Sequence, residues 1–245
     1  MKTPEEIQHK YYTDTAAEYD NSHLNEDDSH YLALKYSFHL LQAEGVKSVL
    51  DVGCGTGRTL KYLRERGLEV HGIEPVQALL DQATQRHGIP SELLTCGSGT
   101  KLPFEDNSFD AVCEFGVLHH VADPDAVLQE MMRVARKVVF ISDGNRFGQG
   151  RIAMKWAKLI LHRTRLWNTV NFVQTRGKKY FISEGDGLAY SYSTFDSLPL
   201  LTKWADRVAI LPTTNEKSNS WFYPLLSASQ LLFFAVKERE ESSLS

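Results

Sequence analysis

The chain has 245 residues, of which 42% are hydrophobic and 24% charged, and its formal net charge is −4. At roughly 150 residues per domain, this length fits one elaborated domain or two small ones, large enough to bury a core without disulfides or metals. The composition excludes collagen-like, coiled-coil and disordered chains. The longest uninterrupted apolar run is Leu231–Val236, far below the ~20 residues of a membrane-spanning helix.

Charged residues and cysteines indicate the compartment. Two lysines and two glutamates lie among the first ten residues, where a signal peptide would be apolar, so we expect no export signal. Cys54, Cys96 and Cys113 lie far apart and form no CxxC pair. This pattern favours a reducing compartment and no structural metal, so we expect a cytoplasmic protein.

Two helices are predicted before residue 45. Thr3 followed by Pro4 and two glutamates is typical of a helix start, with a capping hydroxyl and acids at the positive end of the helix dipole. A second helix is expected over His30–Glu44, with Gly45 as its end. We interpret residues 1–44 as an N-terminal helical cap.

From Ser48 the pattern changes to short apolar strands that alternate with amphipathic helices. The expected strands are Ser48–Val52, Leu68–Glu74, Glu92–Cys96, Phe109–Phe115 and Lys137–Ser142, and the expected helices are Thr56–Arg66, Val76–Arg86 and Asp123 to Arg136. Alternation of this kind predicts a Rossmann-like α/β fold, with a mostly parallel sheet and helices on both faces. Ligands of such sheets bind outside the carboxyl ends of the strands, so the residues that follow each strand are the candidates for function.

The alternation stops after Asp143. Residues 144–193 contain one amphipathic helix followed by a segment rich in tyrosine and glycine, which we interpret as an insertion after the fifth strand that covers the substrate. Helix and strand patterns resume with Thr194–Ala205, Arg207–Leu211 and Leu231–Lys237, which would complete a seven-stranded sheet. The prediction is therefore a single domain: a cofactor-binding core at 45–143, the insertion at 144–193 and the C-terminal part of the core at 194–238.

A glycine-rich loop follows the first predicted strand. It has glycine at every second position, Gly53, Gly55 and Gly57, and then opens a helix. Glycines there let a ligand lie against bare backbone, close to free N–H groups at the helix start. A dinucleotide site would have a glycine where Arg58 stands, which argues against an NAD-dependent oxidoreductase. Asp51, at the end of the same strand, would instead favour a ligand with a positively charged amino group, which its carboxylate could bind.

A carboxylate, Glu74, ends the second predicted strand, seventeen residues after Gly57. An acid at this place can accept hydrogen bonds from both hydroxyls of an unphosphorylated ribose. The alternative is that Glu74 is a solvent-exposed acid before Pro75 with no role in ligand binding.

A third motif runs from Leu102-Pro103-Phe104 through Ser108–Val112, and is followed by Phe115–Val121 and Asp123-Pro124. With these three ordered motifs the chain resembles the class I S-adenosylmethionine-dependent methyltransferases, in particular the type 11-like subgroup that acts mainly on small molecules. The resemblance is close over residues 45–143 and loose after Thr194.

The resemblance implies which residues contact S-adenosylmethionine. They are Asp51, Gly53, Cys54, Gly55, Glu74, Pro75, Val76, Gly97, Ser98, Glu114 and Phe115, together with Tyr12 and Tyr19 of the N-terminal cap. Glu74 would bind the ribose, the glycine loop the methionine end, and Val76 the adenine. Ser98 stands where many relatives carry an acid that accepts a hydrogen bond from the adenine.

Methyl transfer from a sulfonium is an in-line displacement, so the enzyme mainly positions the reactants and excludes water. A base is needed when the accepting atom must lose a proton. His119 and His120 follow the fourth strand, and we predict them as catalytic residues with His119 the first candidate; the alternative is a structural role. Glu114-Phe115-Gly116-Val117 lacks the (Asn/Asp)-Pro-Pro-aromatic motif of nucleic-acid base methylases, so no nucleic-acid partner is expected, and no acidic cluster indicates a metal.

The insertion is basic. Residues 144–193 contain nine Lys/Arg and two acids, a balance of +7 that leaves −11 for the rest of the chain. Its predicted helix, within residues 150–166, has basic residues at helical spacing opposite apolar ones. This face is either merely solvated, or attracts an anionic small substrate, or makes peripheral contact with a membrane. The predicted substrate-binding residues are Tyr190, Tyr192, Arg146 and Arg151.

Three functions stay open from the sequence. The first is methyl transfer to an oxygen or nitrogen of a small-molecule acceptor, which the basic insertion would favour if that acceptor is anionic. The second is methylation of a lipid or quinone at a membrane surface. The third is a non-catalytic sensor or partner protein that binds S-adenosylmethionine. Either a monomer or a homodimer is compatible with the sequence.

Overall fold

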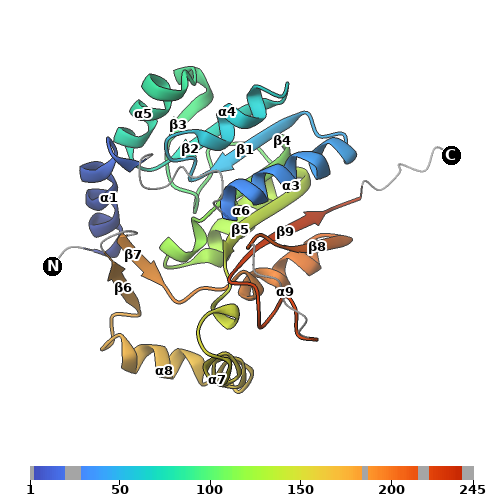
Figure 1. The fold of residues 1–245 in the computed structure, drawn as a ribbon. Coiled ribbons are helices and arrows are strands. Elements are labelled where there is room, and N and C mark those ends of the chain that lie inside the picture. Colours follow the sequence, from blue (N-terminus) through green and yellow to red (C-terminus); the bar gives the residue numbers. More distant parts are fainter. Residues whose placement is uncertain (1–2, 20–28, 184–186, 215–220, 239–245) are drawn as a thin grey trace.

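The computed structural model describes residues 3–19, 29–183, 187–214 and 221–238. Within them, a seven-stranded sheet has the order β3-β2-β1-β4-β5-β9-β8 (Figure 1). The strands are β1 Ser48–Val52, β2 Glu69–Glu74, β3 Leu94–Cys96, β4 Phe109–Phe115, β5 Ala135–Gly144, β8 Arg207–Pro212 and β9 Gln230–Val236. The first five are parallel, and β9 runs antiparallel to both β5 and β8. The predicted seven-stranded, mostly parallel sheet is confirmed.

The strand order reverses between β1 and β4. After β1 the chain builds outward through β2 and β3, and it then returns to add β4 and β5 on the other side of β1. Connections on opposite faces leave a crevice at the carboxyl ends of the two central strands. The glycine loop after β1 and the segment after β4 therefore border the same crevice.

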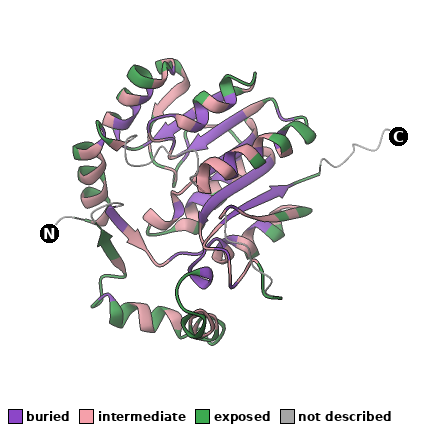
Figure 2. Ribbon diagram, viewed as in Figure 1, coloured by how far each residue is buried: buried purple, intermediate pink, exposed green. Residues whose placement is uncertain are grey.

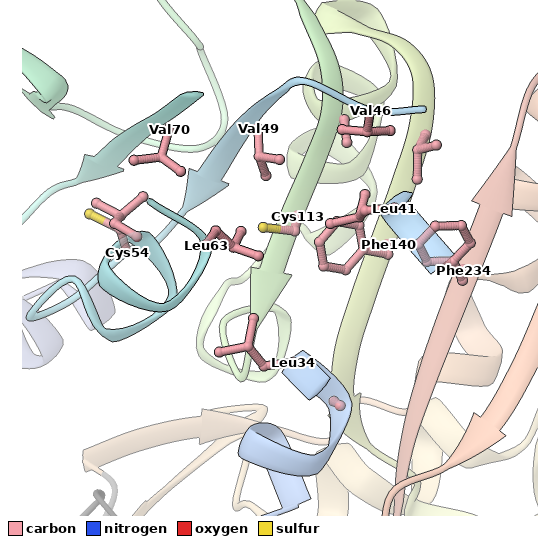
Figure 3. Packing of buried hydrophobic residues seen from close by; sticks show 14 of the residues in the cluster. Leu34, Leu41, Val46, Val49, Cys54, Leu63, Val70, Cys113, Phe140 and Phe234 are labelled. Carbon is pink, nitrogen blue, oxygen red and sulfur yellow. The ribbon is translucent and has the colours of Figure 1, made fainter. Parts of the chain in front are cut away.

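Helices cover both faces of the sheet because side chains alternate along each strand. On one face Val49, Cys113 and Phe140 pack against α3 (Ser29–Ala43), α4 (Arg58–Arg64) and α5 (Gln77–His87), as Figure 3 shows in part. On the other face Leu50 and Val139 pack against α6 (Pro124–Val134) and α9 (Thr194–Trp204). Figure 2 shows the central strands as the buried layer between these helices.

Local signals place most helix ends. Thr3 and Glu6 form the capping box at the start of α1 (Pro4–Thr15), and the Asp123 side chain accepts the N–H of Ala126 at 3.1 Å to cap α6. Many bounds differ from the prediction by one or two residues, and three of these differences have a local reason. Helix α4 begins at Arg58 because Gly57 before it has a left-handed backbone, residues 91–93 form a 3₁₀ turn, and β5 begins at Ala135 because α6 ends at Val134.

The predicted structure of the insertion is wrong in detail. Instead of one helix and a loop, it contains α7 (Ile152–Arg163), α8 (Trp167–Gln174) and a hairpin of β6 (Tyr180–Ser183) with β7 (Gly187–Tyr190). Arg165 has a positive φ of 61°, which ends the first helix and lets a second begin. The asparagines and threonine of α8 are weak helix formers, so propensity hides that helix in the sequence. No helix in the described ranges is long and apolar enough to cross a membrane.

Candidate functional site

A cavity of about 750 Å³ lies at the point where the strand order reverses. Its wall comes from α1, the glycine loop, the end of β2, the loop after β3, the segment after β4, and β7. Of the predicted cofactor contacts, the wall includes Tyr12, Tyr19, Gly53, Gly55, Glu74, Pro75, Val76, Ser98 and Phe115. The topology thus brings together residues more than one hundred positions apart.

The glycine loop is anchored to β2 and presents bare backbone to the cavity. The N–H groups of Gly53 and Cys54 both donate to the carbonyl of Ile73, at 2.7 and 3.1 Å. A Cβ on Gly53 would lie 2.5 Å from Val117, so only glycine fits there. A Cβ on Gly55 would meet only Tyr19, at 3.9 Å, because this glycine faces open space.

Glu74 is the acid at the end of β2, and it is buried within the cavity wall. Its Oε1 accepts the N–H of Val76 at 3.0 Å, and its Oε2 accepts the N–H of Gly55 at 3.3 Å. Burial raises the pKa of Glu74 to about 7, although both backbone hydrogen bonds lower it. Each oxygen keeps a second lone pair, so the carboxylate can accept hydroxyl donors from a ligand.

Four predicted contacts do not line the cavity in the described structure: Asp51, Cys54 and Glu114, which are buried, and Gly97, which is half-buried. Asp51 is buried beneath the loop, where Cys113 donates to it at 3.6 Å, and burial raises its pKa to about 7. The Cys54 side chain fills the space beside Gly72, where an added Cβ would lie 2.6 Å from its sulfur. The strand pattern predicts that these residues lie at or next to the carboxyl ends of the strands. It does not predict which way each side chain points.

His119 and His120 are both in the 3₁₀ turn Leu118–His120, but they point into different surroundings. The Nδ1 of His119 lies 2.8 Å from a carboxylate oxygen of Asp143, a buried residue of β5. His120 is in the cavity wall, with its Nε2 2.9 Å from the hydroxyl of Tyr12. Of the two, His120 is therefore the histidine at the cavity, although the sequence favoured His119.

The hydrogen bonds of His120 assign its tautomer. Its Nδ1 lies 2.6 Å from the carbonyl oxygen of Leu188 in β7. The Gln8 amide nitrogen also lies 3.1 Å from Nδ1, but the carbonyl is closer and can only accept, so we place the proton on Nδ1 and take Nε2 as the acceptor for the Tyr12 hydroxyl. This arrangement leaves the basic nitrogen of His120 on the side of the cavity.

A buried group of acids holds His119 in place. Burial raises the pKa of Glu114 well above its ordinary value, and the neighbouring Asp143 raises it further. Burial would also raise the pKa of Asp143, but the charge and hydrogen bond of His119 hold it below its ordinary value. Glu114 is thus the neutral acid and Asp143 the charged one, with His119 as its partner. Glu114 accepts the N–H of Val117 at 2.8 Å, which fixes the segment after β4.

Sequence reasoning missed several wall residues. Gln8 of α1 accepts the N–H of Leu188 at 2.5 Å, and so ties the N-terminal helix to the insertion hairpin across the cavity. Leu79, Gly99 and Thr100 also line the cavity. The glycines on both sides of Ser98 were a signal in the sequence for Gly99 and Thr100. Glycine is required at position 99 because a Cβ there would lie 2.9 Å from the side chain of Val52.

The four predicted substrate-binding residues lie in different surroundings, and only Tyr190 is at the cavity in the described structure. Tyr190 lines the cavity. The hydroxyl of Tyr192 is buried, 2.6 Å from Ser197. Arg146 is also buried and pairs with both carboxylate oxygens of Asp196, at 2.6 and 2.7 Å, so its charge is already compensated within the fold. Arg151 is exposed at the start of α7 and, in the described structure, lies outside the cavity wall.

The sheet order, the glycine loop, the acid at the end of β2 and the cavity between them define the class I methyltransferase fold. Residues 50–141 match the family model described as a methyltransferase domain, and the resemblance drawn from the sequence is confirmed.

Curated relatives match the same region. An uncharacterized methyltransferase of Mycobacterium tuberculosis is 38% identical over 90 residues, which are 37% of this chain and 36% of the relative. The 18S rRNA (guanine-N(7))-methyltransferase bud23 of Schizosaccharomyces pombe is 32% identical over 89 residues, 36% of this chain and 33% of the relative. The matches thus span little more than a third of these relatives' length.

Solved structures extend the likeness in fold to nearly the whole chain. The magnesium protoporphyrin IX methyltransferase of Synechocystis, crystallised with bound SAH, superposes with a TM-score of 0.61 over 96% of this chain and 100% of its own, at 16% identity. A possible histamine N-methyltransferase of Thermotoga maritima superposes with a TM-score of 0.58 over 94% of this chain, at 15% identity. At this level of identity the likeness concerns the fold.

Proposed function

We propose that this protein transfers a methyl group from S-adenosylmethionine to an oxygen or nitrogen of a small-molecule acceptor. The observation that carries the proposal is Glu74, buried in the cavity wall and hydrogen-bonded to the N–H of Gly55, at the end of the second strand, from which an acid can accept hydrogen bonds from both ribose hydroxyls. The magnesium protoporphyrin IX methyltransferase to which the fold is similar was crystallised with SAM and with SAH, which supports the choice of cofactor.

The residues of the cavity fit an adenosyl group bearing an amino acid. Glu74 would accept hydrogen bonds from the two ribose hydroxyls, and these donors would stabilise the ionised form of a carboxylate that burial otherwise penalises. Val76 and Leu79 form an apolar wall for the adenine. The bare backbone at Gly55 would take the amino-acid end. S-Adenosylmethionine would supply a methyl group on a positively charged sulfur, which an acceptor attacks in line.

The chain itself supplies a cover and a base. Helix α1 and strand β7 close over the cavity and are joined by the hydrogen bond from Leu188 to Gln8, which limits the access of water to the reacting atoms. His120 has its basic Nε2 at the cavity and its other nitrogen held by Leu188. For a hydroxyl acceptor we assign His120 Nε2 as the base: the Tyr12 hydroxyl gives its proton to Nε2 and takes the proton of the acceptor hydroxyl.

A small acceptor is favoured because the cavity is covered by elements of the chain itself. Tyr190 and the N-terminal helix border the side where the acceptor would enter. One relative is by name an rRNA methyltransferase, so the predicted absence of a nucleic-acid substrate stays a prediction, and RNA belongs among the tested acceptors.

The test is transfer of a radiolabelled methyl group from S-adenosylmethionine into separated fractions of small metabolites, lipids and RNA. The proposal expects label in the metabolite fraction, lost in the Glu74→Gln variant. Label in RNA or lipid alone would contradict the acceptor class. Tight cofactor binding without transfer into any fraction would favour the non-catalytic sensor.

A further inference from the structure

Apolar side chains of the insertion lie in solvent instead of in the core. On α7, Ile152 and Ile160 are 66% and 59% exposed, and on α8 Val173 is 69% exposed. Trp221, which follows a segment outside the described residues, is 99% exposed, and its neighbour Phe222 packs edge-on against Trp156 of α7 at 4.8 Å between ring centroids. Large apolar side chains gathered in this way usually mark an interaction surface.

A solvated basic helix would turn its basic side toward water and its apolar side toward the protein. Helix α7 has the opposite orientation. The Nζ of Lys158 donates to the carbonyl oxygens of Arg146 and Gln149, at 3.0 and 3.2 Å, and the ring of His162 lies 3.0 Å from the Arg146 guanidinium. These two members of the predicted basic face thus contact the residues after β5, although the His162 side chain is still 43% exposed. The side of α7 that carries Ile152 and Ile160 is turned outward.

Cations surround these apolar residues. Arg151, Arg163 and Arg165 are exposed at the two ends of α7, and Arg176, Lys178 and Lys179 are exposed after α8. The insertion has a net charge of +7, whereas the rest of the chain has −11. Figure 1 places α7 and α8 together at the end of the molecule away from the central sheet, and Figure 2 shows both helices as exposed or half-buried. One end of the molecule is thus both apolar and cationic.

We propose that this end of the molecule, formed by α7, α8 and Trp221, docks onto the surface of a bilayer that contains anionic phospholipid. The exposed isoleucines and Trp221 would enter the interfacial region, and the arginines and lysines would contact the phosphate groups. The acidic remainder of the chain is repelled by the same surface, which orients the molecule with α7 and α8 toward the lipid.

Charge and composition favour a bilayer over two other occupants. A second copy meeting the same surface would bring two sets of exposed cations together, among them Arg151, Arg163 and Lys178 of each copy, which opposes a symmetric dimer. A nucleic acid would pair with the cations but would leave aliphatic side chains such as Ile152 and Val173 in water. An anionic bilayer complements both the cations and the aliphatic side chains. The proposal goes beyond methyl transfer and does not depend on it.

The experiment is flotation of the full chain with vesicles of phosphatidylcholine alone and of phosphatidylcholine mixed with phosphatidylglycerol. Binding is expected only with the anionic lipid, and it should weaken as salt is raised from about 0.05 to 0.5 M. The variant Ile152→Ser/Ile160→Ser should bind the anionic vesicles about tenfold more weakly. Arg163→Gln/Lys178→Gln should bind about 25-fold more weakly, since each cation near the surface is worth roughly a fivefold change.

Two control variants match these changes elsewhere on the surface. Lys61→Gln/Arg64→Gln removes two exposed charges from α4, and Tyr36→Ser removes an exposed aromatic from α3; both should bind vesicles like the unmodified chain. Absence of binding to anionic vesicles at low salt would overturn the proposal. An equal loss of binding in the control variants would also overturn it, as would capture of RNA or self-association in place of vesicle binding. Cofactor binding, measured by calorimetry on each variant, reports separately on folding and on the proposed function.

Discussion

Replacing Glu74 by glutamine tests the ribose site directly. The glutamine keeps one accepting oxygen and the shape of the side chain, but its NH₂ group cannot accept a hydrogen bond. Of the bonds that two ribose hydroxyls would make to the carboxylate, at least one is lost, and a hydrogen bond to a charged group is worth about 1.5–3 kcal/mol. We therefore expect a loss of about 2–3 kcal/mol in cofactor binding, or roughly 30- to 150-fold in Kd.

The acidity of Glu74 adds a pH dependence to this prediction. Because burial raises its pKa to about 7, the carboxylate that accepts hydroxyl donors is mostly present at pH 8 and mostly protonated at pH 6. Cofactor binding by the unmodified chain should weaken about tenfold from pH 8 to pH 6. The Glu74→Gln variant should lack the part of this dependence that belongs to Glu74. Any part that remains would belong to Asp51, whose pKa burial also raises to about 7.

The assay is isothermal titration calorimetry with S-adenosylhomocysteine at both pH values. Glu69→Gln, at the exposed first position of the same strand, is the matched control and should bind like the unmodified chain. A melting curve without ligand at pH 8 should show a lowered melting temperature for Glu74→Gln, because its NH₂ group cannot accept the backbone N–H of Val76 or Gly55 that one carboxylate oxygen accepts; binding is therefore compared at a temperature at which the variant is folded. If the folded variant binds within threefold of the unmodified chain, the assignment of Glu74 to the ribose is refuted.

Three further substitutions test other parts of the site. His120→Asn should lower kcat for a hydroxyl acceptor by about 100-fold with little change in cofactor Kd, whereas His119→Asn should mainly lower thermal stability; equal losses of kcat would contradict the assignment of the base. Arg146→Gln should lower the free energy of unfolding, measured in urea, by about 3 kcal/mol, because it removes the arginine that pairs with the Asp196 carboxylate. Unchanged stability with a raised KM for the acceptor would instead support direct substrate binding by Arg146. Gly55→Ala should weaken cofactor binding about tenfold, because it places a methyl group in the cavity. The control is Gly45→Ala: Gly45 also has a positive φ, so the backbone strain is similar, but its methyl group would lie in open space and cofactor binding should be unchanged.

The sequence predicted the fold and the main parts of the site because these depend on local patterns. Apolar strands, helix ends and the glycine loop are each determined by neighbouring residues, and the parallel topology then brings the strand ends together. Glu74 could be predicted for this reason, since its place at the end of β2 also places it in the cavity.

Side-chain partners distant in the sequence could not be predicted in the same way. Arg146 has the residue type of an anion-binding side chain, and its actual partner, Asp196, lies 50 residues further on. The choice between His119 and His120 depends on Asp143 and Leu188, which only the folded chain brings to the turn after β4. The outward side of α7 was likewise hidden, because helical spacing shows which residues share a side but not which side meets the protein.

The most direct measurement is a crystal structure of this protein with S-adenosylhomocysteine. The account predicts the ligand in the cavity at the carboxyl ends of β1, β2 and β4, with both ribose hydroxyls within hydrogen-bond distance of Glu74 and the amino-acid end beside Gly55. Density for the ligand elsewhere on the molecule, or a ribose turned away from Glu74, would contradict it.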